Sequence, residues 1–156
     1  MIFVILGTQE VPFDRMLQAV DNLIAECHIT DTVIAQVGHT KYVAKNFKTI
    51  PFISEQEFQQ YVKQASIIIT HAGSGALFNA IKWGKKTIAM ARLSKYNEMP
   101  DDHQTELAKK LSLDGYIVDG TYNLVDAWKK LSTFIPRPND FKCSIKEELR
   151  VLFTKS

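Results

Sequence analysis

One stretch of the sequence, residues 66–84, constrains the fold more than any other. It opens with Ile67, Ile68 and Ile69, three consecutive β-branched residues that predict a buried strand. A turn with two glycines follows, and then a helical pattern that ends at Gly84, a natural C-terminal cap. A strand that leads through a glycine-rich turn into a helix directs backbone N–H groups and the positive end of the helix dipole at one point. Such a point is suited to an anion, most often a phosphate.

The rest of the chain alternates between strand and helix patterns. Apolar runs predict further strands at residues 2–6, 32–37, 48–53, 85–90 and 116–118. One-sided apolar spacing predicts further helices at residues 16–27, 54–64, 103–112, 123–133 and 140–153. This alternation predicts an α/β fold, a Rossmann-like three-layer α/β/α domain with a mostly parallel sheet.

Composition narrows the class of protein. The 156 residues are enough for one domain with a substantial core, and the net charge of +2 gives no electrostatic argument for nucleic acid. Cys27 and Cys143 have no metal-type spacing and suit a reducing compartment. The apolar start at residues 1–6 is too short for a signal peptide, and no apolar run approaches membrane-spanning length. We therefore expect a cytoplasmic protein that needs another molecule to hold it at a membrane.

Several small residues follow predicted strands and should gather at one edge of the sheet, where ligands of parallel sheets bind. These are Gly7 and Thr8, then Gly38, and then the turn at residues 71–75. Spacing alone favours a plain strand-end turn for Gly7 and Thr8. For Ser74, spacing leaves open a role as helix N-cap or as hydroxyl donor to a phosphate.

A second polar group, at residues 101–104, combines two Asp, a His and a Gln where a long polar loop meets a helix. One Asp is expected to be the N-cap, and the remaining side chains suit recognition of sugar hydroxyls. A solvated helix start is an equally good interpretation. No metal is expected, because no second ligand cluster has usable spacing. The nucleotide-binding loop motifs of ATP, GTP and NAD proteins and the nucleophile elbow are also missing from the sequence.

Taken together, these motifs resemble a known family. The carrying residues are Leu6-Gly7-Thr8 with Phe13-Asp14, Gln36-Val37-Gly38, the run Ile69 to Gly75, Gly84-Lys85-Lys86, and Asp102-His103-Gln104 ahead of Glu106-Leu107-Ala108. They resemble the C-terminal, nucleotide-sugar-binding half of the two-domain GT-B glycosyltransferases. They are more similar still to subunits that consist of that half alone. Those are the catalytic subunit of the UDP-GlcNAc transferase of dolichol-linked oligosaccharide synthesis and bacterial relatives in capsule and exopolysaccharide synthesis. The stretch at residues 92–104 looks most like the bacterial branch.

The resemblance implies a single nucleotide-sugar-binding domain over residues 1–156 and assigns its site. The diphosphate would face Gly7, Thr8 and the turn of His71, Ala72, Gly73, Ser74 and Gly75. The uracil would lie near Phe52 and Ile53, and the sugar hydroxyls near Asp102, His103 and Gln104. Gln36 and Gly38 complete the implied UDP-sugar site. Related enzymes often have a Glu at the position of Asn79, where it holds the ribose hydroxyls; Asn79 keeps hydrogen-bonding capacity without the charge.

The family implies a split enzyme. This chain would bind the UDP-sugar, and a membrane-anchored acceptor-binding glycosyltransferase subunit would bind a lipid-linked saccharide acceptor at the inner face of the membrane. We expect inverting transfer of a hexose, such as galactose or GlcNAc, with no cofactor and no metal. The general base is expected on the partner, and His103 is the candidate if it lies on this chain. The alternatives are a non-catalytic accessory subunit that stabilises the partner and, more distantly, a nucleotide-sensing module.

The predicted C-terminal helix, residues 139–155, is amphipathic through Phe141, Ile145, Leu149, Leu152 and Phe153. It suits docking on the partner or packing on its own domain, and the sequence leaves both open. A chain that exposes an interface also allows homo-oligomers.

Overall fold

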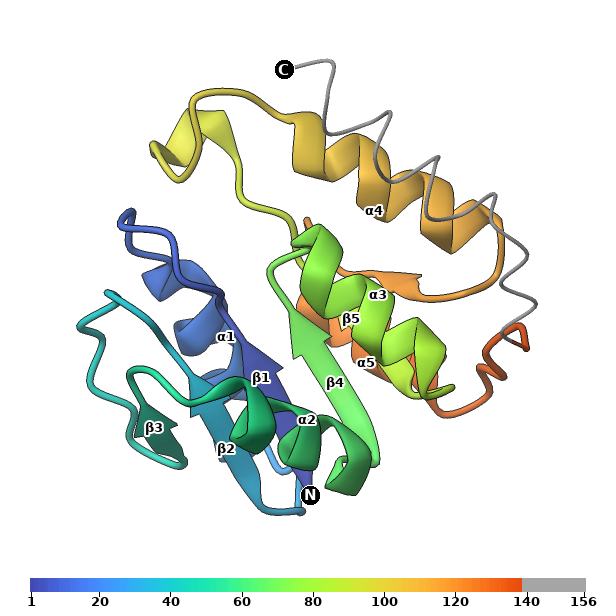
Figure 1. Cartoon of the computed structure of the whole chain (residues 1–156), viewed down its shortest axis with the longest axis horizontal. Helices are drawn as coiled ribbons and strands as arrows, with labels where there is room; N and C mark the ends of the chain where they lie inside the picture. Colours follow the sequence, from blue (N-terminus) through green and yellow to red (C-terminus); the bar gives the residue numbers. More distant parts are fainter. Residues whose placement is uncertain (139–156) are drawn as a thin grey trace.

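The computed structural model describes residues 1–138, and the predicted helix at residues 139–155 lies outside them. Figure 1 shows a central sheet with helices in front of it and behind it. The elements in chain order are β1 (Ile2–Ile5), α1 (Asp14–Ala25), β2 (Val33–Gln36), β3 (Lys48–Ile50), α2 (Glu55–Gln64), β4 (Ile67–Thr70), α3 (Ser74–Lys82), β5 (Lys86–Ala89), the 3-10 helix η1 (Ser94–Tyr96), α4 (His103–Leu113), β6 (Val118–Asp119) and α5 (Leu124–Leu131). The predicted Rossmann-like α/β fold is confirmed.

The sheet has six strands in the order β3-β2-β1-β4-β5-β6, and every pairing is parallel. The strand order reverses between β1 and β4, which lie side by side with Ile5 opposite Thr70. In an open parallel sheet such a reversal creates a crevice beyond the carboxyl ends of the two strands. Both strands end in residues predicted for the site, so the topology alone brings Gly7 close to His71.

Two apolar layers hold the helices on the sheet. On one face, Ile2 and Val4 of β1 pack with Met16 and Leu17 of α1 and with residues of α5. On the other face, Phe3 and Ile5 pack with α2 and α3, and a neighbouring cluster joins α3, β5 and α4. All four residues of β1 are buried, as its unbroken apolar sequence predicts for a strand covered on both sides.

The end of α3 and the start of α2 follow the predicted signals. Ser54 accepts a hydrogen bond from the Glu57 N–H, and the Glu57 side chain accepts one from the Ser54 N–H, which is the predicted capping box. Gly84 adopts φ 63° directly after the last turn of α3, as expected for a helix-ending glycine.

The last strand begins later than predicted. The sequence predicts a strand over residues 116–118, and β6 instead covers Val118–Asp119. The Tyr116 N–H donates to the Leu111 carbonyl and the Gly115 N–H to the Ser112 carbonyl, so both complete the end of α4. Tyr116 and Ile117 are buried against α4, and their apolar character therefore reflects packing rather than strand pairing.

Candidate functional site

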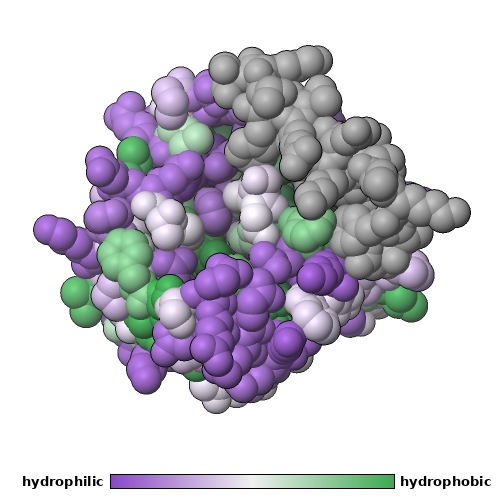
Figure 2. Space-filling model, in the orientation of Figure 1, coloured by the Kyte–Doolittle hydropathy of each residue, from purple (hydrophilic) through white to green (hydrophobic). Residues whose placement is uncertain are grey.

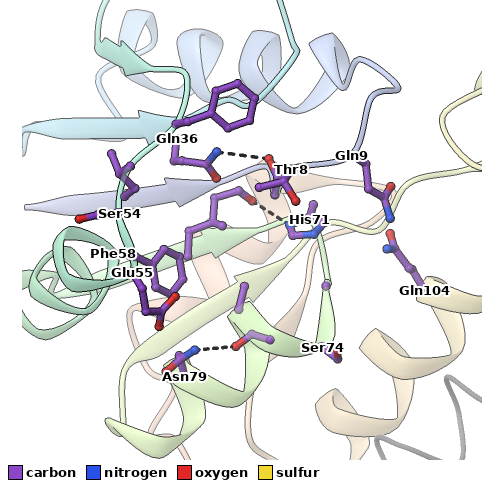
Figure 3. A pocket seen from close by; sticks show the side chains of 17 residues that line it. Thr8, Gln9, Gln36, Ser54, Glu55, Phe58, His71, Ser74, Asn79 and Gln104 are labelled. Atoms are coloured by element: carbon purple, nitrogen blue, oxygen red, sulfur yellow. Dashed lines mark hydrogen bonds between the residues drawn. The ribbon is translucent and has the colours of Figure 1, made fainter.

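A cavity of about 430 Å³ opens beyond the carboxyl ends of β1 and β4, at the reversal of strand order. The space-filling view shows hydrophobic residues at a hollow beside a largely hydrophilic surface (Figure 2). The lining side chains converge on the cavity from several elements (Figure 3). They are Ile5, Gly7, Thr8, Gln9, Gln36, Phe52, Ile53, Ser54, Glu55, Phe58, His71, Gly73, Ser74, Gly75, Ala76, Asn79 and Gln104.

The His71 imidazole forms the inner wall of the glycine turn, as we call residues 71–75. Its Nδ1 lies 3.1 Å from the Ile5 carbonyl oxygen, which can only accept, so Nδ1 carries the proton. A Cβ placed on Gly73 would lie 2.2 Å from His71 Nε2, and one on Gly7 would lie 2.7 Å from it. Glycine is therefore required at both positions to let the backbone lie against the ring.

The electrostatic state of His71 follows from its burial. Burial lowers the pKa of the His71 imidazole to about 4, the hydrogen bond to the Ile5 carbonyl opposes that shift, and the Arg92 charge adds to it. The ring is neutral at pH 7 and leaves an unprotonated Nε2 beside Gly7 and Gly73. The ring is a fixed polar wall and contributes no full charge to the site.

The first turn of α3 presents free N–H groups to the cavity. The N-cap position is occupied by Gly73 and the helix begins at Ser74, so of the two roles left open for Ser74 the N-cap is excluded. No side chain caps this end, although Ser74, Gly75 and Ala76 all line the cavity. The N–H groups of a first helical turn have no partner within the helix, and together with the helix dipole they favour an anion. This end of α3 therefore has the geometry of an anion site, and phosphate binding there stays a prediction.

The turn after β1 is stabilised by Gln36 and packs against Gly38. Gly7 adopts φ 77°, and its carbonyl accepts a hydrogen bond from Gln36 Nε2 at 3.3 Å. The same Gln36 nitrogen donates to the Pro51 carbonyl at 2.8 Å, so one amide joins the ends of β1 and β3. Gly38 lies outside the cavity lining, where a Cβ would meet the Gly7 carbonyl oxygen at 2.5 Å. Gly38 therefore supports Gly7 instead of facing a ligand itself.

The charged segment, as we call residues 92–102, is held to the β1 side of the molecule by buried ionic groups. The Arg92 side chain is buried and donates to the Val11 carbonyl at 2.6 Å and the Leu6 carbonyl at 3.3 Å. Arg15 donates to the Glu98 carboxylate at 2.9 Å, and Glu98 also accepts from the Leu93 N–H. These bonds fix the start of α4 relative to the turn after β1.

The end of this segment supplies the predicted N-cap residue of α4, and its side chain bonds elsewhere. Asp102 occupies the N-cap position of α4, but its carboxylate accepts from the Ser94 N–H and hydroxyl. Asp101 instead accepts from the His103 N–H at 3.1 Å. The prediction that one Asp is the N-cap is therefore confirmed for Asp102, whose side chain closes the loop on η1 and makes no capping hydrogen bond.

Gln104 is the residue of α4 that reaches the cavity. It is buried, and its Oε1 has no hydrogen-bond partner among residues 1–138. Figure 3 shows the Gln9 and Gln104 side chains pointing toward one another across the cavity mouth. A buried amide oxygen without a partner is a site for a ligand donor such as a hydroxyl.

Besides Gly38, three of the predicted site residues lie outside the cavity lining. His103 Nε2 lies 3.7 Å from Asp101 Oδ2, and His103 Nδ1 lies 3.9 Å from Glu106 Oε2. The Asp102 carboxylate accepts a hydrogen bond from the Ser94 hydroxyl. Ala72 is fully buried with φ 67° and turns the backbone between His71 and Gly73. Neighbouring residues on a helix point about 100° apart, so residues 103 and 104 do not share a face.

Four side chains that were not predicted for the site also line the cavity: Gln9, Ser54, Glu55 and Phe58. A usable signal existed for two of them. The capping box places Ser54 and Glu55 directly after a strand of the parallel sheet, and therefore at the edge where ligands bind. The predicted residues Phe52, Ile53 and Asn79 are all in the lining.

Two further observations concern residues 1–138. No group of three or more His, Cys, Asp or Glu in this part of the chain could hold a metal ion. Within the same residues, no helix is long and apolar enough to cross a membrane.

The sequence matches the family model "Glycosyltransferase family 28 C-terminal domain" over residues 1–140. The chain belongs to this family. It is 28% identical over 90 residues to the mouse (Mus musculus) UDP-N-acetylglucosamine transferase subunit ALG13, and the match covers 54% of this chain and 7% of that protein. Against the human (Homo sapiens) protein of the same name it is 26% identical over 125 residues, covering 74% of this chain and 10% of the relative. The chain thus spans a small part of these curated relatives.

Solved structures of other proteins share the fold of this chain. The NMR structure of ALG13 superposes with a TM-score of 0.62 at 20% identity, covering 97% of this chain and 94% of that one. The crystal structure of Acinetobacter baumannii MurG gives a TM-score of 0.57 at 15% identity, covering 97% of this chain and 49% of that one. The predicted likeness to the C-terminal half of a GT-B glycosyltransferase is confirmed for family and fold, while the exopolysaccharide and capsule branch stays a prediction.

Proposed function

We propose that this chain is the UDP-sugar-binding, catalytic subunit of a two-component inverting glycosyltransferase. Its partner is a membrane-anchored subunit that binds a polyprenyl-diphosphate-linked saccharide and recruits this chain to the inner face of the membrane. The hexose, galactose, GlcNAc or a similar sugar, enters an exopolysaccharide or capsule. Membership of the glycosyltransferase family supports the reaction class, and the relatives named as UDP-N-acetylglucosamine transferase subunits support a two-subunit enzyme.

One observation carries the proposal: the order of chemical groups along the cavity. In Figure 3, Ser54 lies on one side of the cavity, His71 in the middle and Gln104 on the other side. Phe52 and Ile53, which directly precede Ser54, provide apolar lining for a base, the glycine turn provides N–H groups for a diphosphate, and Gln104 provides an unpartnered amide oxygen for a sugar hydroxyl. A nucleoside diphosphate sugar carries base, diphosphate and sugar in that order. Because the lining offers a suitable group for each of these three parts, it favours this donor class over a simple phosphate.

In the proposed reaction, a hydroxyl of the acceptor attacks the anomeric carbon from the face opposite the UDP. The bond between that carbon and the diphosphate oxygen breaks, so the sugar configuration inverts and UDP leaves with its bonding electrons. Negative charge develops on the leaving oxygen, and the N–H groups at Ser74 and Gly75, with the dipole of α3, stabilise it. Because these groups are positioned before the substrate arrives, they need no rearrangement during the reaction.

The hydroxyl proton must pass to a general base, which we assign to the partner. The His103 side chain is 40% exposed and lies outside the cavity lining, near Asp101 and Glu106. The same observation favours the second candidate function, an accessory subunit that stabilises a partner already able to transfer the sugar. The two functions differ in whether substitutions in this cavity reduce transfer.

Calorimetry and transfer assays test the proposal on the full chain and on its purified complex with the acceptor subunit. We expect UDP to bind, and Gln104→Ala to lower the rate of transfer by about tenfold through loss of one sugar contact. Gln64→Ala, which changes an exposed Gln on α2 away from the cavity, should leave binding and transfer unchanged. No UDP binding by chain or complex would contradict the proposed donor site. UDP binding with full transfer activity in Gln104→Ala would favour the accessory role.

A further inference from the structure

Glu55 places a carboxylate in the cavity to which no role has yet been given. It is the first residue of α2 and follows Ser54, directly beyond the apolar end formed by Phe52 and Ile53. Among the described lining residues it is the only acid. Its position at a helix N-terminus favours the negative charge, because the positive end of the helix dipole lies beside it.

Hydrogen bonds join Glu55 to Asn79 across two helices. Gln59 Nε2 donates to Glu55 Oε1 and to Asn79 Oδ1, each at 2.9 Å. Asn79 Nδ2 in turn donates to the Gly75 carbonyl at 2.9 Å. In Figure 3 the Glu55 carboxylate points toward Asn79, below the Phe58 ring. One amide thus holds two acceptors, one from α2 and one from α3, at the same part of the cavity.

The place of this pair along the cavity indicates what it binds. Phe52 and Ile53 directly precede Ser54 and Glu55 in the chain, and Asn79 is hydrogen-bonded to Gly75 of the glycine turn. The ribose of a nucleoside diphosphate connects the base to the diphosphate, so it must occupy the space between those two parts. Glu55 Oε2 makes no hydrogen bond with any residue of the described chain and remains available to a hydroxyl. A carboxylate is the group that dinucleotide-binding sheets use to hold ribose hydroxyls.

We propose that Glu55 is the ribose-binding acid of this site, supplied from α2 where α3 carries the uncharged Asn79. Glu55 accepts from the 2′ hydroxyl, and Asn79 adds a second hydrogen-bonding group for the 3′ hydroxyl. The pair then selects ribonucleoside over 2′-deoxyribonucleoside diphosphates. This inference rests on the proposed function, since it names the group that recognises one part of the same donor.

Calorimetry with UDP and 2′-deoxy-UDP on the full chain tests it. We expect wild-type protein to bind UDP about tenfold more tightly than 2′-deoxy-UDP, and Glu55→Gln to reduce that ratio to about twofold. If Glu55 had only a structural role, Glu55→Gln would weaken the binding of both nucleotides equally and leave the ratio of affinities unchanged. Thermal unfolding of Glu55→Gln should match wild type, because its exposed hydrogen bond to Gln59 contributes little.

The matched control is Glu57→Gln. It removes the same charge from the same turn of α2, lies outside the cavity lining, and keeps a residue that can complete the capping box. The ratio of its affinities for UDP and 2′-deoxy-UDP should stay at the wild-type value. If wild type binds UDP but Glu55→Gln keeps the tenfold ratio, the assignment of Glu55 is overturned and the proposed function stands. If wild type binds neither nucleotide, alone or with its partner, both are overturned.

Discussion

The glycine turn and the charged segment both bring residues to the cavity, and they are held in place by opposite means. The glycine turn is positioned by close packing of backbone on a neutral imidazole, with Gly7 and Gly73 against His71. The charged segment is positioned by ionic groups, through Arg92 and the Arg15–Glu98 pair. Packing contacts act over a few tenths of an ångström, whereas charge pairs respond to the protonation of their members and, where exposed, to salt.

This difference matches what each part does. The N–H groups of the glycine turn must be rigid, because their value to an anion depends on being aligned beforehand. The charged segment leads into α4 and Gln104, which contacts the sugar in the proposed function. We therefore expect the two regions to fail under different perturbations.

Substituting Gly73 with Ala should have the largest effect on stability. The new methyl group would meet the His71 ring, which is buried and cannot rotate away without breaking its bond to the Ile5 carbonyl. Overpacking of this kind costs about 3 kcal/mol in the free energy of unfolding, measured by urea denaturation. Gly75→Ala is the matched control, because no atom lies within 4 Å of a Cβ there, and its stability should be unchanged or slightly higher. Equal losses in the two variants would contradict the packing role of His71.

Acid should weaken the glycine turn next most strongly. The His71 pKa is lowered by burial to about 4 in the folded chain, from an ordinary value of 6.5, so protons bind the unfolded chain first. Stability is complete above pH 6.5 and falls as the pH drops toward 4, by about 2 kcal/mol between pH 7 and pH 5. His71→Asn, whose amide can still donate to the Ile5 carbonyl, should lack this part of the pH dependence. Parallel pH curves for the two proteins would show that His71 does not titrate in this way.

Neutralising Glu98 should have the smallest effect of the three and should act on the charged segment. Glu98→Gln keeps the shape of the side chain but removes the charge that faces Arg15, at a cost of about 1.5 kcal/mol in the free energy of unfolding. Hydrogen exchange should increase at the Leu93 N–H and the start of α4, and not in the glycine turn. Glu106→Gln, which removes only an exposed partner of His103, should change stability by less than about 0.5 kcal/mol. If Glu98→Gln increased hydrogen exchange in the glycine turn as well as at the start of α4, the two regions would not be stabilised independently.

Sequence alone predicted the glycine turn better than the charged segment, for a physical reason. Gly7, His71 and Gly75 follow buried strands directly, and parallel strands bring their carboxyl ends to one edge regardless of detail. The direction of Asp102 and His103 depends on hydrogen bonds to Ser94 and Asp101, residues whose contacts no spacing rule specifies. A shift of one residue along a helix decided that only Gln104 faces the cavity.

The cavity wall contributed by α2 escaped prediction for a related reason. The capping box correctly located the start of α2, but it did not show that α2 turns Glu55 and Phe58 toward α3. That depends on the packing of α2 and α3 on the same face of the sheet, where Phe3, Val62 and Ala80 share one apolar cluster. Tertiary packing of this kind has no local signal in the sequence.

The contact of His71 with Gly7 and Gly73 also bears on how such a chain can change over evolutionary time. As long as the imidazole is present, a mutation at either glycine is removed by selection, because the ring occupies the space that a side chain needs. Replacement of His71 by a smaller residue would open that space and make Gly73 free to vary, whereas the φ of 77° would still favour glycine at position 7. The order of substitutions is therefore constrained: the ring must be lost before Gly73, and a lineage that has replaced Gly73 cannot readily regain the ring.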